Sequence, residues 1–261
     1  MKALSTQVHE SVVIVGAVQI GTGTFIAPNV TIFGPCRIGS GNVIGPNAVI
    51  GAPPQDDAWS MEAHVSGFEG GAVGCETVIG DNNVIREFVT IHRGTERPTS
   101  IGDNNYLMAY AHVAHDCRVG NRCKITNAVQ LAGHVTVMDG TYIGLSATVH
   151  QFAVIGAASI IGMGSLVARD VPPGAKVVGS PARCVGPNVM ALSPIVGVQP
   201  VTWWSSFLDK TDEGVPAEAI AMRRDWELVC SQRNEWRARI KQRRSAQLQV
   251  LKHGNGGGEG A

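Results

Sequence analysis

The stretch "IGDNNYLMAYAHVAHDCRVGNRCKITNAVQL" (101–131) carries an aliphatic residue at every sixth position. The same spacing continues to residue 167, and it also runs through 14–50 and 79–91. A period of six is neither that of a helix nor that of an alternating strand, but a short β segment followed by a tight corner accounts for it. Three such hexads close one triangular coil, so residues eighteen apart stack ~4.8 Å above each other.

The repeat therefore predicts the fold class: an all-β solenoid, namely a parallel β-helix of hexapeptide repeats over residues 8–188, which winds left-handed in its known examples. Two interruptions, 52–77 and 94–100, are rich in prolines, glycines and charged residues. We expect both to be loops that leave the prism. Loops on a rigid scaffold are where binding residues tend to lie.

The hexads stop after residue 188, and a C-terminal extension occupies 189–253. We expect 198–214 to be irregular and a helix to begin at about Pro216, because proline suits the first turn of a helix. The glycine-rich segment 254–261 reads as a flexible tail. Four apolar residues of the predicted helix follow a helical spacing and are expected to pack rather than bind: Trp226, Val229, Trp236 and Ile240.

The composition narrows the function classes. The chain has 21 basic and 21 acidic residues, so its net charge offers no argument for a nucleic-acid or membrane-surface partner. Its first residues do not resemble a signal peptide, and its apolar runs are too short for an integral membrane segment. Six cysteines without a CxxC pair suggest reduced thiols and a cytoplasmic location.

The repeat predicts which histidines lie close together in space. Counting in steps of eighteen from His115 reaches Gly133 and then Gln151, and three more histidines fall close to that column. Six residues therefore converge at one corner of the prism within ~10 Å, which predicts a functional site: His112, His115, Gly133, His134, His150 and Gln151. Of the remaining histidines, three are expected to be ordinary surface residues (His9, His64 and His253), and the role of His92 stays open.

This cluster suits acyl transfer. Histidine near neutral pH is a general base for a hydroxyl or amine nucleophile, and Asp116 either orients the ring of His115 or is a solvated corner residue. Gly133 leaves a backbone N–H accessible to a developing oxyanion. The acceptor can attack directly, so a serine or cysteine nucleophile, a metal or a cofactor is not needed. Cys117 and Cys123 are expected to pack.

Four segments together resemble one family, the UDP-N-acetylglucosamine 3-O-acyltransferases of lipid A biosynthesis (LpxA). The similarity covers most of 8–188 and is strongest over 79–188. The matching segments are "VTIHRGT" (89–95), "LMAYAHVAHDCRVGN" (107–121), "QLAGHV" (130–135) and "VHQF" (149–152). The resemblance implies a homotrimer with active sites between adjacent prisms. It also implies transfer of a 3-hydroxyacyl chain from the phosphopantetheine thioester of acyl carrier protein to the 3-position of a UDP-sugar, the first step of lipid A biosynthesis.

By motif match, the resemblance makes His115 the general base, Asp116 its orienting acid and Gly133 the oxyanion donor. Met163 occupies the position that measures acyl length, where a side chain favours a shorter chain; by its own character it also suits core filling. The remaining matches are substrate-binding positions: Asp56 in the "PQDD" loop, His112, His134, His150, Gln151 and Asn188.

The chain also departs from the family. Asp57 and Ala58 stand where the family has a loop lysine, and "NVMALSPIVG" (188–197) keeps the asparagine but lacks the acid and the two arginines that serve nucleotide recognition. The acceptor can therefore be another nucleotide or amino sugar, and the donor can be coenzyme A. Two further alternatives are a zinc enzyme resembling γ-carbonic anhydrase and a trimer without catalytic activity.

The segment 236–252 carries six basic residues and no acid. It is either a solvated helix face or a docking site for the acidic acyl carrier protein through electrostatic steering. Nucleic acid is a weaker candidate partner because the whole chain is neutral.

Overall fold

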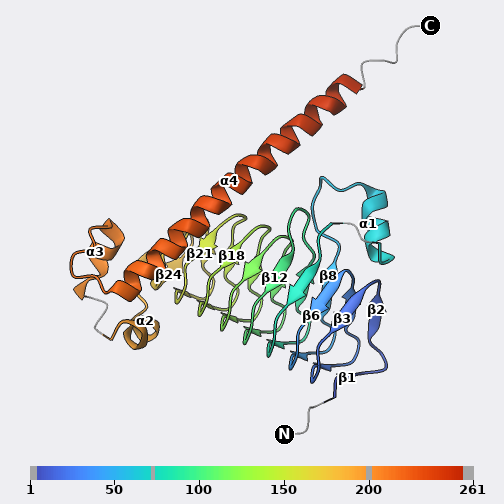
Figure 1. The fold of residues 1–261 in the computed structure, drawn as a ribbon, viewed down its shortest axis with the longest axis horizontal. Coiled ribbons are helices and arrows are strands. Elements are labelled where there is room, and N and C mark those ends of the chain that lie inside the picture. Colours follow the sequence, from blue (N-terminus) through green and yellow to red (C-terminus); the bar gives the residue numbers. More distant parts are fainter. Residues whose placement is uncertain (1–4, 72–73, 198–201, 255–261) are drawn as a thin grey trace.

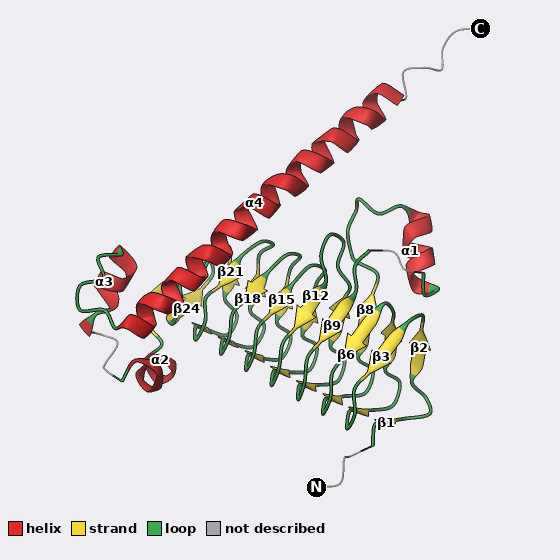
Figure 2. Cartoon of the chain, in the orientation of Figure 1, coloured by secondary structure: helices red, strands yellow, loops and turns green. Residues whose placement is uncertain are grey.

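The computed structural model describes residues 5–71, 74–197 and 202–254. It confirms the predicted left-handed parallel β-helix, followed by helices at the C-terminal end (Figures 1 and 2). Three sheets of parallel strands form the faces of the prism, and consecutive strands of the chain belong to different sheets, except for an antiparallel pair within residues 175–187. The predicted coil of three hexads is therefore the repeating unit of this fold.

The first sheet contains β1 (Gln7–Val8), β4 (Phe25–Ile26), β7 (Val43–Ile44), β10 (Val84–Ile85), β13 (Tyr106–Leu107), β16 (Lys124–Ile125), β19 (Tyr142–Ile143), β22 (Ile160–Ile161), β24 (Ala175–Gly179) and β25 (Ala182–Pro187). The second contains β2 (Val13–Val15), β5 (Thr31–Phe33), β8 (Val49–Ala52), β11 (Thr90–His92), β14 (His112–Val113), β17 (Gln130–Leu131), β20 (Thr148–Val149) and β23 (Leu166–Val167). The third contains β3 (Val18–Ile20), β6 (Cys36–Ile38), β9 (Thr77–Ile79), β12 (Thr99–Ile101), β15 (Arg118–Val119), β18 (Thr136–Val137) and β21 (Val154–Ile155).

The register follows the predicted step of eighteen residues. Val113 pairs with Leu131, and Leu131 pairs with Val149. All three side chains are fully buried in the ladder that fills the prism. Burying one such aliphatic side chain contributes about 1.5–3 kcal/mol, so the six-residue spacing is what stabilises the solenoid.

The corners have a conformation of their own. At one corner Asp116, His134 and Phe152, each eighteen residues after the last, adopt left-handed backbone angles with φ of 61°, 67° and 67°. Few residues other than glycine adopt this conformation. Here it turns the chain between the second and the third sheet, and it places these three side chains in one column.

The two interruptions of the repeat, 52–77 and 94–100, are the first and the second excursion, and the first contains a helix that the sequence did not predict. Helix α1 (Met61–Phe68) begins after Ser60, whose hydroxyl accepts a hydrogen bond from the backbone N–H of Ala63. The guanidinium of Arg93, which is fully buried, donates to the carbonyl oxygens of Gly51, Gly67 and Gly71. This arginine from a neighbouring coil therefore fastens the excursion to the prism.

The C-terminal extension becomes helical earlier than predicted. After the antiparallel pair β24–β25 come α2 (Val189–Val196), α3 (Trp204–Asp209) and α4 (Ala217–Gly254). Helix α3 lies inside 198–214, so the expectation of irregular structure there was wrong. The cause is apolar packing, since Trp204 and Phe207 are buried and their rings stack 5.2 Å apart. Residues 198–201 and the tail from 255 lie outside the described part.

Helix α4 crosses the solenoid obliquely and continues beyond it (Figure 1). Arg233 fixes the crossing, because its guanidinium donates two hydrogen bonds, of 2.8 and 2.6 Å, to the carboxylate of Asp170 and a third to the carbonyl oxygen of Phe152. Of the helices in the described ranges, none is both long enough and apolar enough to cross a membrane.

Candidate functional site

The site is built around His115, which follows strand β14. Its Nδ1 lies 2.7 Å from the Oδ2 atom of Asp116. A carboxylate only accepts hydrogen bonds, so Nδ1 carries the proton and Nε2 keeps its lone pair. Nε2 is thus the atom of this ring that can take a proton from a substrate.

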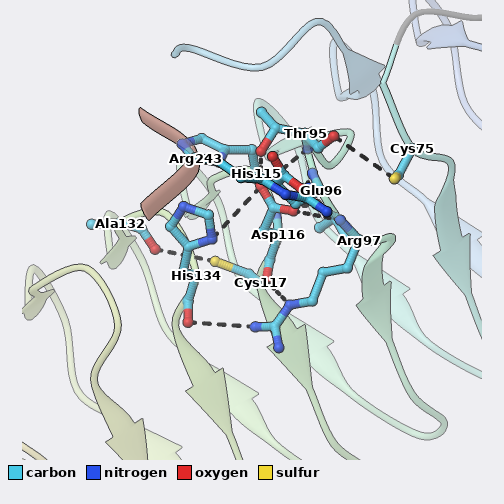
Figure 3. Close-up of polar contacts among 11 residues, drawn as sticks. Cys75, Thr95, Glu96, Arg97, His115, Asp116, Cys117, Ala132, His134 and Arg243 are labelled. Carbon is cyan, nitrogen blue, oxygen red and sulfur yellow. Dashed lines mark hydrogen bonds and ion pairs between the residues drawn. The ribbon is translucent and has the colours of Figure 1, made fainter. Parts of the chain in front are cut away.

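Asp116 is fully buried and held by the second excursion (Figure 3). Its Oδ2 atom accepts hydrogen bonds from the backbone N–H and the hydroxyl of Thr95, at 3.0 and 2.7 Å. Its Oδ1 atom accepts from the backbone N–H groups of Glu96 and Arg97, at 2.9 and 2.8 Å. The residue is therefore no solvated corner: it is a preorganised acceptor that fixes the tautomer of His115.

The electrostatics agree with this geometry. Burial alone would raise the pKa of Asp116, but the hydrogen bonds from His115 and Thr95 outweigh it and hold the pKa of this carboxyl well below its ordinary value. Burial raises the pKa of the adjacent Cys117 thiol to about 12. At neutral pH the aspartate is therefore ionised, whereas the thiol is protonated and inert as a nucleophile.

Gly133 lies against the ring of His115. A Cβ atom added to Gly133 would stand 2.7 Å from both Cε1 and Nε2 of that ring, so a side chain is excluded here. In the described ranges the N–H of Gly133 donates to no protein acceptor, as at the equivalent corner positions 115 and 151. What sets Gly133 apart is the combination of a free donor, no side chain and an adjacent imidazole nitrogen.

His134 is almost completely buried next to this pair. Its ring stacks on Phe152 with centroids 4.3 Å apart and meets His115 edge to face at 4.8 Å. Burial lowers the pKa of His134 to about 4, and attraction to Asp116, whose Oδ2 lies 3.7 Å from Nδ1, offsets only part of this effect. His134 is therefore neutral at physiological pH.

A cavity of about 520 Å³ opens beside His115 and His134. One side is formed by the first excursion, through Gln55, Asp56 and Asp57. The solenoid adds Gln151 and Phe152. Helix α4 also lines the cavity, through Arg237, Ile240, Lys241 and Ser245; the sequence did not predict this contribution.

Four predicted site residues are not among those that line this cavity. The Nδ1 atom of His112 is 2.7 Å from the hydroxyl of Thr90. His150 is exposed, and its Nδ1–H donates to the carbonyl oxygen of Gln151 at 3.0 Å. Met163 is 74 % exposed at a different corner of the prism. Asn188 precedes α2, and its side-chain amide donates to the carbonyl oxygen of Ala158.

His92, whose role the sequence left open, packs edge to face on His112 with centroids 5.0 Å apart. It is buried, and its Nδ1 atom has no hydrogen-bond partner among the described residues. Burial lowers the pKa of His92 to about 4. This neutral pair supports the coil beneath His115.

Several residues of the site escaped the sequence analysis. Thr95 lies in the second excursion, which could be predicted as a loop but not as the cradle of Asp116. Trp236 was expected to pack, and it does so against His134, with centroids 4.7 Å apart, and against Arg97, whose guanidinium lies 4.0 Å from the ring centre. Its helical spacing was a signal for packing, but it did not reveal that the partner is the site.

Ligand atoms of His115, Asp116 and His134 lie within 4.8 Å of one another, and two histidines with one carboxylate can bind zinc. The hydrogen bonds argue against a cation here. Both oxygens of Asp116 are already occupied by five donors, one of which is His115 itself. The geometry favours an acid–base pair over a metal site.

Comparison with known proteins agrees with this picture. The model of the family "Bacterial transferase hexapeptide (six repeats)" matches residues 98–133. An acyl-[acyl-carrier-protein]–UDP-N-acetylglucosamine O-acyltransferase of Alkalilimnicola ehrlichii is 51 % identical over 117 residues, which are 44 % of this chain and 45 % of that protein. The chain thus spans about half the length of the curated relatives it matches.

Solved structures extend the likeness over most of the chain. A structure described as LpxA, a UDP-N-acetylglucosamine acyltransferase from Bacteroides fragilis, is 33 % identical with a TM-score of 0.58, covering 74 % of this chain and 77 % of that one. The UDP-N-acetylglucosamine acyltransferase of Francisella novicida gives 29 % identity and a TM-score of 0.66, with coverages of 84 % and 88 %.

Proposed function

The chain belongs to the family of UDP-N-acetylglucosamine acyltransferases, and on that premise we propose that it transfers a (3-hydroxy)acyl chain from acyl carrier protein to the 3-position of a UDP-N-acetylglucosamine-type sugar, as in the first step of lipid A biosynthesis. The observation that carries this proposal is the 2.7 Å contact between His115 and Asp116, which leaves Nε2 free beside Gly133 at the wall of the cavity.

The proposed reaction proceeds by direct attack. The 3-hydroxyl oxygen of the sugar adds to the thioester carbonyl carbon while Nε2 of His115 takes the hydroxyl proton. The N–H of Gly133 stabilises the oxyanion of the tetrahedral intermediate. The intermediate then collapses to the ester, the C–S bond breaks, and the imidazolium returns its proton to the departing phosphopantetheine thiolate.

Asp116 has two tasks in this scheme. Its hydrogen bond keeps His115 in the tautomer with a basic Nε2, and its charge stabilises the imidazolium that forms. Because its own pKa is so low, it does not take up the proton. The chemistry requires no metal and no cofactor beyond the phosphopantetheine group that acyl carrier protein brings as part of the donor.

The substrate contacts are also part of the proposal. Asp56 and Gln151 line the cavity and are placed to meet polar groups of the sugar. His134 lines it too, although its burial between aromatic rings leaves it little room to move. His112, His150, Met163 and Asn188 do not line this cavity. A role for them in substrate binding requires a bound acyl chain or a second prism to reach them.

A homotrimer is the assembly we propose. The corner between the first and the second sheet carries a row of exposed apolar side chains at two neighbouring positions: the stacked pair Phe88 and Tyr110, and further along, one position before that column, Leu145 and Met163. A row of exposed apolar residues on a rigid surface is a feature of protein interfaces. Light scattering on the purified protein should give three chain masses. We place the enzyme in the cytoplasm, where its six free cysteines stay reduced.

The proposal is tested by incubating the purified protein with 3-hydroxyacyl carrier proteins of several chain lengths and a panel of UDP-amino sugars. Mass spectrometry should detect an acylated UDP-sugar, and Met163 predicts a preference for the shorter chains. His115→Ala should abolish the product. His9→Ala changes an exposed histidine on the first coils and serves as the matched control.

The same experiment addresses the second candidate, a transferase with another acceptor or with a coenzyme A donor. The residues at the acceptor end of the site differ from the family pattern, with Asp57 and Ala58 in place of the loop lysine. His115-dependent product from coenzyme A thioesters, without product from acyl carrier protein, would favour this candidate. Absence of transfer from either donor would contradict both.

A further inference from the structure

Helix α4 brings two positive charges to the catalytic cavity. Arg237 and Lys241 lie four residues apart and both line it, since residues at this spacing share one face of a helix. Within the described ranges neither side chain has an ion pair or a hydrogen bond, and the contact that the structure shows for them is that of the Arg237 guanidinium with the ring of Phe152. Both cations line the cavity without a carboxylate partner among the described residues, so they are available to an anionic ligand.

The position of this helix face is fixed from both sides. Before it, Arg233 binds Asp170, and Trp236 packs on the ring of His134. After it, Arg243 forms a 2.5 Å ion pair with Glu96, whose backbone N–H donates to Asp116. The guanidinium of Arg237 itself lies over the ring of Phe152, 5.1 Å from its centre. The two cations are therefore held at the site.

The cavity is lined by groups of both charges, contributed by different segments of the chain. The wall formed by the first excursion carries the carboxyl groups of Asp56 and Asp57, whereas the α4 wall carries Arg237 and Lys241. His115 lines the same cavity and, in the proposed reaction, its Nε2 supplies the base. A ligand that carries both hydroxyl groups and an anion matches this lining, because carboxylates accept hydrogen bonds from hydroxyls and cations bind phosphate.

We propose that Arg237 and Lys241 bind a phosphate group of the substrate, so that α4 of the same chain completes the catalytic cavity. The proposal rests on the proposed function, in which both substrates carry phosphate: the diphosphate of the sugar nucleotide and the phosphodiester of the phosphopantetheine arm. Arginine suits this task through its bidentate fork, and lysine acts as a point charge.

The test measures binding to the full chain by isothermal titration with two probes, UDP and 4′-phosphopantetheine. Arg237→Gln and Lys241→Gln should each weaken the binding of one probe about tenfold or more, the usual cost of one charge-assisted hydrogen bond. Arg239→Gln is the matched control, because Arg239 lies on the same helix but lines a different cavity. It should change either affinity less than twofold.

Loss of UDP affinity would assign the phosphate to the acceptor, and loss of 4′-phosphopantetheine affinity would assign it to the donor. Unchanged affinities in both variants, or equal losses in the Arg239→Gln control, would overturn the inference. If Arg237→Gln fails to fold, the exposed Lys241 still provides the test. Binding that depends on these residues in a protein without transferase activity would support the anion site and reject the proposed reaction.

Discussion

The ring of His134 lies flat on the ring of Phe152, eighteen residues further along the chain, with centroids 4.3 Å apart and an interplanar angle of 8°. Asp116 occupies the same corner one coil earlier, and all three residues have left-handed backbone angles. The corner that turns the chain thus also aligns the acid, a neutral histidine and an aromatic ring. The geometry of the candidate site is therefore a product of the repeat itself.

Asp116→Asn should lower kcat about 10³–10⁴-fold, the size of effect expected when the orienting carboxylate of a catalytic histidine is neutralised. An asparagine can donate to Nδ1 and so stabilise the tautomer in which Nε2 carries the proton. Steady-state kinetics at saturating substrate would measure this loss. Asp103→Asn, at a corner where Asp103 accepts a hydrogen bond from the N–H of Asp81, should retain activity. A small loss in Asp116→Asn would refute the proposed role.

Gly133→Ala should reduce kcat about a hundredfold or more. The added methyl group would stand 2.7 Å from Nε2 of His115, so the ring must move, and a displacement of about 1 Å can cost that much in rate. Gly140→Ala is the control, because the nearest atom to its Cβ is 4.0 Å away and Ala128 shows that alanine adopts similar backbone angles. Equal activity of the two variants would contradict this placement of His115.

The solenoid and the centre of the site were predictable because one physical rule connects sequence to space. Each hexad contributes one strand and one corner, so counting by eighteen brings His115, Gly133 and Gln151 together without any knowledge of side-chain contacts. The same counting placed His134 near this column, although its stacking between Phe152 and Trp236 depends on ring orientations that the spacing does not determine.

The contribution of α4 could not be predicted in this way. The spacing of Trp236 and Ile240 indicates an apolar face, but it does not identify which corner of which coil that face covers. Helix α1 could not be predicted from the sequence for a similar reason. It has only eight residues, and the chain around it is held by Arg93 from the neighbouring coil. Both features depend on tertiary contacts that have no local signature.

Stability should fall as the pH drops from about 6.5 to about 4. His92 and His134 have folded-state pKa values of about 4 against an ordinary value of 6.5, so the unfolded chain binds more protons in this window. Stability is complete above pH 6.5 and decreases toward pH 4, by up to about 3 kcal/mol for each histidine. Thermal unfolding at pH 7 and pH 5 would measure this. The loss should be smaller in His92→Gln, and an unchanged loss would exclude a contribution from His92.

Chelation should leave activity intact. Both carboxylate oxygens of Asp116 accept hydrogen bonds. A zinc ion would therefore have to displace several donors to bind the cluster of His115, Asp116 and His134. Dialysis against EDTA followed by the transferase assay tests the prediction, and metal analysis of the purified protein gives the stoichiometry. One tightly bound zinc per chain together with loss of activity on chelation would point instead to a metalloenzyme.

Trp236→Ala should loosen α4 from the site and raise KM, with a smaller effect on kcat, because His115 and Asp116 are held by the second excursion and not by the helix. Trp236 contacts both His134 and Arg97, and removing it should cost about 2 kcal/mol of stability because the side chain is only half-buried. Hydrogen exchange should show faster exchange in α4 around residues 233–243.

The control is Trp226→Ala on the same helix, outside the residues that line the cavity. This variant should lower stability without changing KM. Equal effects of the two variants on KM would mean that the helix acts only through overall stability, and that the wall formed by Arg237 and Lys241 is not needed for substrate binding.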